Sequence, residues 1–102
     1  MYTIIRRYQL APGADQNEVV RLVRESYLPL VTSAPGFVSY AILALAETGI
    51  CSISTFTDQA AAEQAAQQSA AWVLRSVVQY LAGPPEITAG EVRIAAGSLP
   101  AV

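Results

Sequence analysis

The stretch Phe37–Ala46 has the residue types of a β-strand, yet it is apolar on both sides. One side carries Phe37, Ser39, Ala41, Leu43 and Leu45, and the other carries Val38, Tyr40, Ile42, Ala44 and Ala46. A sheet with one face in water shows a polar residue at every second position. This strand therefore predicts a sheet that is covered on both faces.

Turn signals and hydrophobic periodicity predict four strands and two helices along the chain. The strands are Tyr2–Leu10, Phe37–Ala46, Ile50–Phe56 and Ile87–Ala95, and the helices lie between residues 15 and 33 and between 58 and 82. Strands 37–46 and 50–56 form an antiparallel hairpin because their connection is short. The order β-α-β-β-α-β predicts an α+β, ferredoxin-like fold with an antiparallel sheet. We expect one domain over residues 1–96 and a flexible tail over 97–102.

Three features of the predicted helices can be checked against a structure. Asp15 has the position of an N-cap, and Glu18 that of the reciprocal capping-box residue, while Thr57 or Asp58 is expected to cap the second helix. Pro29 removes a backbone donor and crowds the Glu25 carbonyl, so the first helix should kink or restart. The second helix, if unbroken to residue 82, would be roughly 35 Å long against about 25–30 Å for the strands. We therefore expect it to bend near Gln68–Ala70.

The chain of 102 residues has no segment left to cover the second face of the sheet. Only 14% of its residues are charged, against about 25% in an average soluble domain. Both observations favour a homodimer in which two copies pack their sheets face to face.

Missing residue types exclude several functions. The chain has no histidine or lysine and one cysteine, Cys51. These absences exclude histidine-based triads, histidine-ligated metals and haem, and lysine Schiff bases within the chain. The net charge of −2 argues against nucleic acid as a partner. The longest weakly polar stretch contains Glu63 and Arg75, so we expect no membrane segment and a cytoplasmic location.

Two motifs carry a resemblance to a known family. The first is Ala34-Pro35-Gly36-Phe37 after the helix end Tyr27-Leu28-Pro29-Leu30, and the second is Ala70-Ala71-Trp72-Val73. Together they resemble the antibiotic biosynthesis monooxygenase-like family of dimeric α+β barrels, over Ile4 to Ile94. The resemblance implies a dimer with an apolar pocket for an aromatic small molecule. It also implies cofactor-independent oxidation of quinols or polyketides, and we expect no cofactor.

The resemblance also suggests site residues. Polyketide-oxidising members use an asparagine and a tryptophan, and Trp72 and the amide of Gln68 are the candidates here. Arg75 lies beside Trp72 on the same helix and is a candidate anchor for a phenolate, a carboxylate or a reduced-oxygen anion. We expect Tyr27, Tyr40 and Cys51 to line the substrate pocket.

Each candidate also has a purely structural interpretation. Trp72 suits a core position, Arg75 a solvated helix surface, and Cys51 the role of a small buried apolar residue. Arg6 and Arg7 point to opposite faces of their strand, so at least one is expected to pair with a carboxylate such as Glu91 or a partner's acid. Glu91 is also the expected rim partner of Arg93.

Three functions therefore stay open at the level of the sequence. The first is a cofactor-independent monooxygenase acting on an electron-rich polycyclic phenol or hydroquinone. The second is a non-catalytic, ligand-binding or stress-associated dimer. The third is a scaffold whose pocket is filled by its own side chains.

Overall fold

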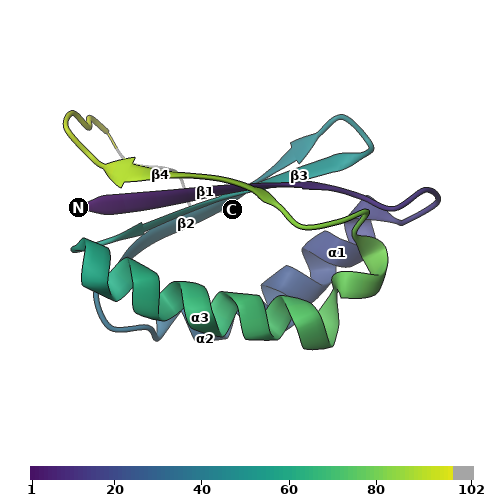
Figure 1. Ribbon diagram of the computed structural model, residues 1–102, viewed down its shortest axis with the longest axis horizontal. Helices are drawn as coiled ribbons and strands as arrows, with labels where there is room; N and C mark the ends of the chain where they lie inside the picture. Colours follow the sequence, from purple (N-terminus) through teal and green to yellow (C-terminus); the bar gives the residue numbers. More distant parts are fainter. Residues whose placement is uncertain (98–102) are drawn as a thin grey trace.

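One antiparallel sheet and a layer of helices on one of its faces make up the computed structural model, which describes residues 1–97 (Figure 1). The strands, in the spatial order β2-β3-β1-β4, are β1 (Tyr2–Gln9), β2 (Phe37–Leu45), β3 (Gly49–Phe56) and β4 (Glu86–Glu91). The helices are α1 (Gln16–Leu22), α2 (Leu28–Thr32) and α3 (Gln59–Ser76). The predicted β-α-β-β-α-β ferredoxin-like order is confirmed. Most of the expected tail, residues 98–102, lies outside the described residues.

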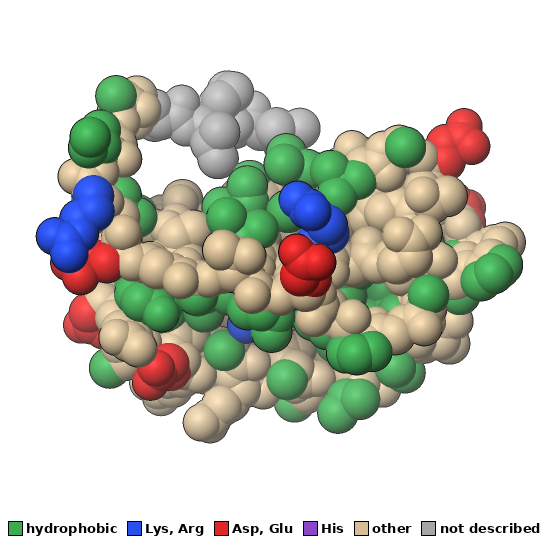
Figure 2. Space-filling view, turned by 45° about the horizontal axis from the view of Figure 1, so that its top comes forward, with side chains coloured by type: hydrophobic (Ala, Val, Ile, Leu, Met, Phe, Trp, Pro, Cys, Tyr) green, Lys and Arg blue, Asp and Glu red, His purple; other side chains and the backbone are tan. Residues whose placement is uncertain are grey.

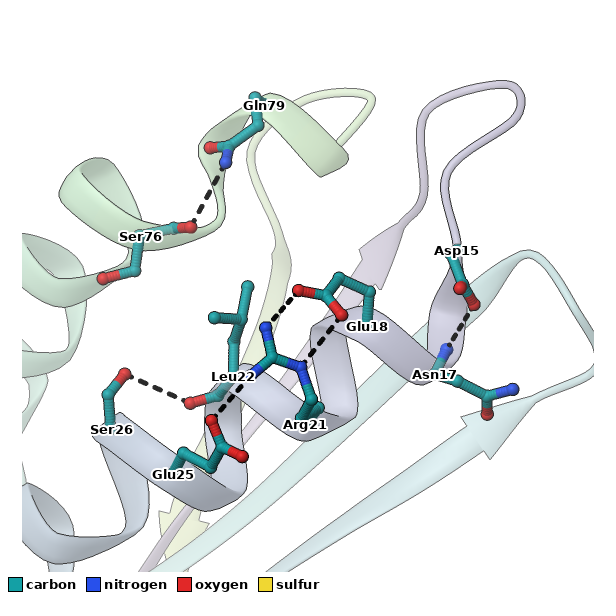
Figure 3. Close-up of polar contacts among 9 residues, drawn as sticks. All are labelled: Asp15, Asn17, Glu18, Arg21, Leu22, Glu25, Ser26, Ser76 and Gln79. Atoms are coloured by element: carbon teal, nitrogen blue, oxygen red, sulfur yellow. Dashed lines mark hydrogen bonds and ion pairs between the residues drawn. The ribbon is translucent and has the colours of Figure 1, made fainter.

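The start of α1 confirms one predicted cap and corrects another. Asp15 accepts a hydrogen bond of 3.0 Å from the backbone N–H of Asn17, as an N-cap does. Glu18 forms no capping box; its carboxylate accepts from the guanidinium of Arg21, which also reaches Glu25 (Figure 3). The prediction for Glu18 was wrong because an arginine one turn along attracts the carboxylate more strongly than a neutral N–H does.

The helical segment restarts where Pro29 predicts. A π-helical turn, Val23–Tyr27, separates α1 from α2, and Pro29 lies in the first turn of α2. Proline has no N–H to give to the Glu25 carbonyl, so the regular helix is interrupted one turn before it. The interruption leaves the buried side chains of Val23 and Tyr27 on the face towards the sheet.

Helix α3 is continuous, so the predicted bend near Gln68–Ala70 is wrong. It ends at Ser76 and is followed by a 3₁₀ turn, Val78–Tyr80. Its 18 residues span about 27 Å at 1.5 Å per residue, which matches the strands without a bend. Asp58 caps it by accepting from the N–H of Ala61 at 2.8 Å, as one of the two predicted caps.

The sheet has a helix-facing side and an outer face. On β2, Tyr40 and Ile42 belong to the helix-facing side, where they pack against the core. A register shift between Phe37 and Ser39 brings Phe37 opposite Phe56, with ring centroids 6.3 Å apart. The prediction that Phe37 shares a face with Ser39 was therefore wrong, because the irregularity reverses the alternation at that point.

Within residues 1–97, no helix lies over the outer face (Figure 1). Its middle is formed by small and aliphatic side chains of three strands, Ile5, Ala41, Leu43, Cys51 and Ile53. Leu43 is 45% exposed there. Figure 2 turns the top of the view in Figure 1 towards the reader. It shows hydrophobic side chains (green) on this side of the molecule beside a few charged ones (blue and red). One face of the sheet thus buries a core, and the other leaves apolar side chains uncovered.

Candidate ligand pocket

A small pocket lies between the helix-facing side of the sheet and the helices. Its walls are mainly aromatic and aliphatic, with Tyr8, Tyr27, Tyr40 and Trp72 as the aromatic members. Ser52 and Ser69 are the serines on its wall. The cavity is about 40 Å³, which holds only a few water molecules. A ring-containing ligand therefore enters only by displacing wall side chains.

The aromatic rings of the pocket are held in fixed positions by one another and by hydrogen bonds. The ring of Tyr27 lies 5.1 Å from that of Trp72 and 5.5 Å from that of Tyr40, centroid to centroid. The Tyr27 hydroxyl donates to Ser69 at 3.0 Å, and the Trp72 indole N–H donates to Ser26 at 2.7 Å. Tilted pairs at these distances are favourable, so the walls are defined before a ligand arrives.

The structure brings three of the six predicted site residues together. Trp72, Tyr27 and Tyr40 all line the pocket. Gln68 and Arg75 are exposed on α3 and lie off the pocket wall, and Cys51 is buried on the outer face of β3. Catalytic roles for Trp72, Gln68 and Arg75 stay predictions.

Helix geometry explains why Gln68 and Arg75 do not lie on the pocket wall. The buried residues of α3 follow a regular spacing: Ala62, Ala65, Ser69 and Trp72. This spacing of three and four residues makes one stripe that faces the sheet. Gln68 and Arg75 flank this stripe, so Ser69 rather than Gln68 contributes the polar group near Tyr27.

The sequence predicted a partner for Arg6 or Arg7 but did not predict that Arg6 lies beside the pocket. Arg6 is 8% exposed on the helix-facing side of β1, and within residues 1–97 it forms no ion pair or side-chain hydrogen bond. Ser52 lies opposite it on β3, and the hydroxyl of Ser54 is buried without a partner in the described chain. The sequence contains a pattern that could have indicated this polar cluster. Arg6 and Tyr8 lie two residues apart on one face of β1, and Ser52 and Ser54 do the same on β3.

The predicted pairing of Arg6 with Glu91 is absent, because the register places Glu91 opposite Tyr2, four residues away. Arg93 and Glu91 also form no ion pair. Within residues 1–97 the ion pairs are those that Arg21 makes with Glu18 and Glu25. Arg6 is therefore a buried cation without a neighbouring carboxylate in this part of the chain.

Burial changes the acidity of two wall tyrosines. Desolvation raises the pKa of Tyr40 well above its ordinary value, and it raises the pKa of Tyr8 as well. The positive charge of Arg6 lowers both pKa values and so opposes part of the rise. Both hydroxyls are thus neutral donors at physiological pH and lie within the electrostatic reach of Arg6.

Within residues 1–97, no three histidine, cysteine or acidic side chains gather as a metal site would require. None of the helices in that range combines the length and apolarity needed to cross a membrane.

Solved structures share the fold across almost the whole chain. A protein of unknown function from Nitrosomonas europaea has a TM-score of 0.80 and 24% identity, covering 98% of this chain and 94% of its own. A monooxygenase from Streptomyces coelicolor, solved with nanaomycin D, has a TM-score of 0.75 and 22% identity, covering 98% and 92%. SnoaB, a cofactor-independent oxygenase from Streptomyces nogalater, has a TM-score of 0.72 and 18% identity, covering 92% and 94%. The chain matches none of the curated proteins compared with it.

The fold and the pocket together define a class: a small ferredoxin-like α+β domain with an aromatic cavity between its helices and its sheet. A family model described as antibiotic biosynthesis monooxygenase matches residues 1–73. The chain belongs to that family, as the resemblance implied.

Proposed function

We propose that this protein is a homodimeric, cofactor-independent monooxygenase that acts on an electron-rich aromatic phenol or hydroquinone. The observation that carries the proposal is the aromatic pocket, in which Trp72, Tyr27 and Tyr40 surround a cavity next to unpaired polar groups. Similar folds occur in a cofactor-independent oxygenase and in a monooxygenase bound to nanaomycin D, which supports an aromatic ligand.

The proposed reaction needs no electron source besides the substrate. An anthrone loses a proton from its methylene carbon, and the resulting carbanion gives an electron pair to O₂. A carbon–oxygen bond forms, and loss of water from the hydroperoxide leaves the quinone, so anthrone and O₂ give anthraquinone and H₂O. The protein binds the ring, keeps bulk water away and stabilises the anion with its donors.

Oxygen uptake with anthrone tests this function. We expect the wild-type protein to accelerate uptake and quinone formation, and Trp72→Ala to reduce the rate at least about tenfold by removing a wall of the pocket. Leu74→Ala is the matched control, because Leu74 lies on the same helix but is 69% exposed. Equal rates with and without the wild-type protein would contradict the proposal.

A second function is favoured by one specific observation. The amide of Gln68 and the guanidinium of Arg75, expected to assist the reaction, both lie on the surface of α3. A pocket without them suits a dimer that binds an aromatic metabolite without changing it. In that case anthraquinone or anthrone would raise the melting temperature of the protein with no oxygen uptake.

The proposed dimer joins two outer faces of the sheet. Support comes from the uncovered aliphatic residues there, Leu43 among them, since packing two such faces removes apolar area from water. Light scattering should give twice the mass of the 10.8 kDa chain. Leu43→Arg should yield monomers and Leu74→Arg should not; a wild-type monomer would contradict the dimer.

A further inference from the structure

A polar strip on the helix-facing side of the sheet adjoins the pocket, and it consists of Arg6, Tyr8, Tyr40, Ser52 and Ser54. Arg6 of β1 lies directly opposite Ser52 of β3, and Ser52 is a wall residue of the pocket. Tyr8 follows Arg6 by two residues and also lines the pocket, as does Tyr40 of β2. Residues two apart on one strand, or opposite on neighbouring strands, share a face, so Arg6 lies beside the wall.

The guanidinium of Arg6 has no partner in the described chain. The residue as a whole is 8% exposed, and no carboxylate of residues 1–97 forms an ion pair with it. Removing a charge from water without an opposite charge is strongly unfavourable. By contrast, Arg21 is paired on the surface, and Arg75 is exposed and stays hydrated. Arg6 is thus a buried arginine on the pocket side that has no ion pair among residues 1–97.

Other polar groups of the strip are unpaired too. The Ser54 hydroxyl is buried without a hydrogen-bond partner among the described residues. The hydroxyls of Tyr8 and Tyr40 form no hydrogen bond within residues 1–97, although Tyr27 beside them does. A buried hydroxyl is normally paired, so the unpaired Ser54 hydroxyl on the same face as Arg6 indicates that a polar partner is missing there.

We propose that this strip binds an anionic oxygen of the ligand, with Arg6 as its counter-ion and neighbouring hydroxyls as donors. The ligand is therefore an aromatic carboxylate or phenolate rather than a neutral ring. This inference rests on the proposed function only in assuming that the pocket takes an aromatic molecule, and it assigns to Arg6 the anion-binding role expected for Arg75.

A carboxylate of a partner subunit is the competing counter-charge. Arg6 faces the helices, whereas the proposed dimer contact uses the outer face of the same sheet. A partner's acid would have to reach around the β4 edge, where Ile87 is opposite Arg6. A ligand in the adjoining pocket reaches the guanidinium more directly.

Two probes with the same ring and similar size, one anionic and one neutral, test the inference. Isothermal titration calorimetry near pH 7.5 compares 2-naphthoate with 2-naphthamide. We expect the wild-type protein to bind 2-naphthoate at least about tenfold more tightly, since a charge-assisted bidentate pair is stronger than a neutral hydrogen bond. Arg6→Gln should abolish this preference while leaving the affinity for 2-naphthamide within about twofold.

Controls keep the outcomes distinct. Arg75→Gln should retain the full preference, and Arg6→Lys should retain part of it because the charge stays but the planar fork is lost. A circular-dichroism melt of each variant confirms that it is folded. If 2-naphthamide and 2-naphthoate bind equally to the wild-type protein, or if Arg6→Gln keeps the preference, the inference is wrong. If neither probe binds, the aromatic pocket of the proposed function fails as well. If Arg6→Gln splits the dimer and keeps the preference, a partner's acid is the counter-charge.

Discussion

The indole Nε1 of Trp72 donates a hydrogen bond of 2.7 Å to the hydroxyl oxygen of Ser26, which in turn donates to the Leu22 carbonyl at 3.1 Å. The second bond of this chain is drawn in Figure 3. Ser26 belongs to the π-helical turn before α2, and Trp72 to α3. The irregular turn of one helical segment therefore positions the largest aromatic side chain of the pocket wall.

Ser26→Ala should lower the free energy of unfolding by about 1 kcal/mol, because it leaves the indole N–H of Trp72 without its acceptor. Urea denaturation measures the change. Ser33→Ala is a matched control from the same helical segment, since its hydroxyl donates only to the exposed Pro29 carbonyl. If both variants lose the same free energy of unfolding, the hydrogen bond to Trp72 contributes no more stability than an exposed one.

Tyr27 and Ser69 should be energetically coupled. The hydroxyl of Tyr27 donates to the hydroxyl of Ser69 at 3.0 Å in a buried environment, 42 positions apart in the sequence. In a double-mutant cycle of Tyr27→Phe and Ser69→Ala, we expect a coupling free energy of about 0.5–1.5 kcal/mol. If the two substitutions lower the free energy of unfolding by strictly additive amounts, the two hydroxyls do not form this hydrogen bond. The cycle also tests whether α3 and the π-helical turn are joined at the pocket.

The stability of the fold should fall at alkaline pH because of Tyr40. Burial raises the pKa of this tyrosine in the folded state, so the unfolded chain ionises first, at about pH 10. Above about pH 10, each further pH unit lowers the free energy of unfolding by up to about 1.4 kcal/mol. Below about pH 10, the contribution of Tyr40 to stability is fully present. Urea midpoints at about pH 9 and pH 11 should differ more for the wild-type protein than for Tyr40→Phe. If the urea midpoints of the wild-type protein and of Tyr40→Phe fall equally between the two pH values, the Tyr40 hydroxyl is not buried.

Arg6→Met should raise the melting temperature of the ligand-free protein by at least about 4 °C, since it replaces an unpaired buried charge with an apolar side chain of similar length. Melting curves are compared at one protein concentration, because a dimer melts in a concentration-dependent way. Arg24→Met provides the control, because Arg24 is exposed on the π-helical turn and lies away from the sheet. A lower melting temperature for Arg6→Met would mean that Arg6 stabilises the fold itself.

The fold could be predicted from the sequence because each element is fixed locally. Asp58 at the start of α3, Pro29 in the first turn of α2 and the short turn before Gly49 are signals read over a few residues. The length of α3 could not be predicted in the same way, because the sequence Gln68–Ala70 carries no signal for or against a bend. The helix ends at Ser76, where the chain must return to the sheet edge.

The site was predictable only in part. Trp72, Tyr27 and Tyr40 are large aromatic residues and lie on the pocket wall as expected. For Arg6 the sequence predicted burial and a carboxylate partner, but the register of β4 is needed to see that Glu91 lies opposite Tyr2 instead. Gln68 is exposed, whereas Ser69, the next residue and about 100° further around the helix, lies on the pocket wall.

Trp72 is also the only tryptophan in the chain. Ultraviolet light absorbed by the neighbouring rings of Tyr27 and Tyr40 can pass by resonance transfer to this one indole, and its emission depends on the polarity around it. The protein therefore carries a built-in optical reporter at the pocket wall. A shift in its emission maximum can be attributed to one residue without labelling.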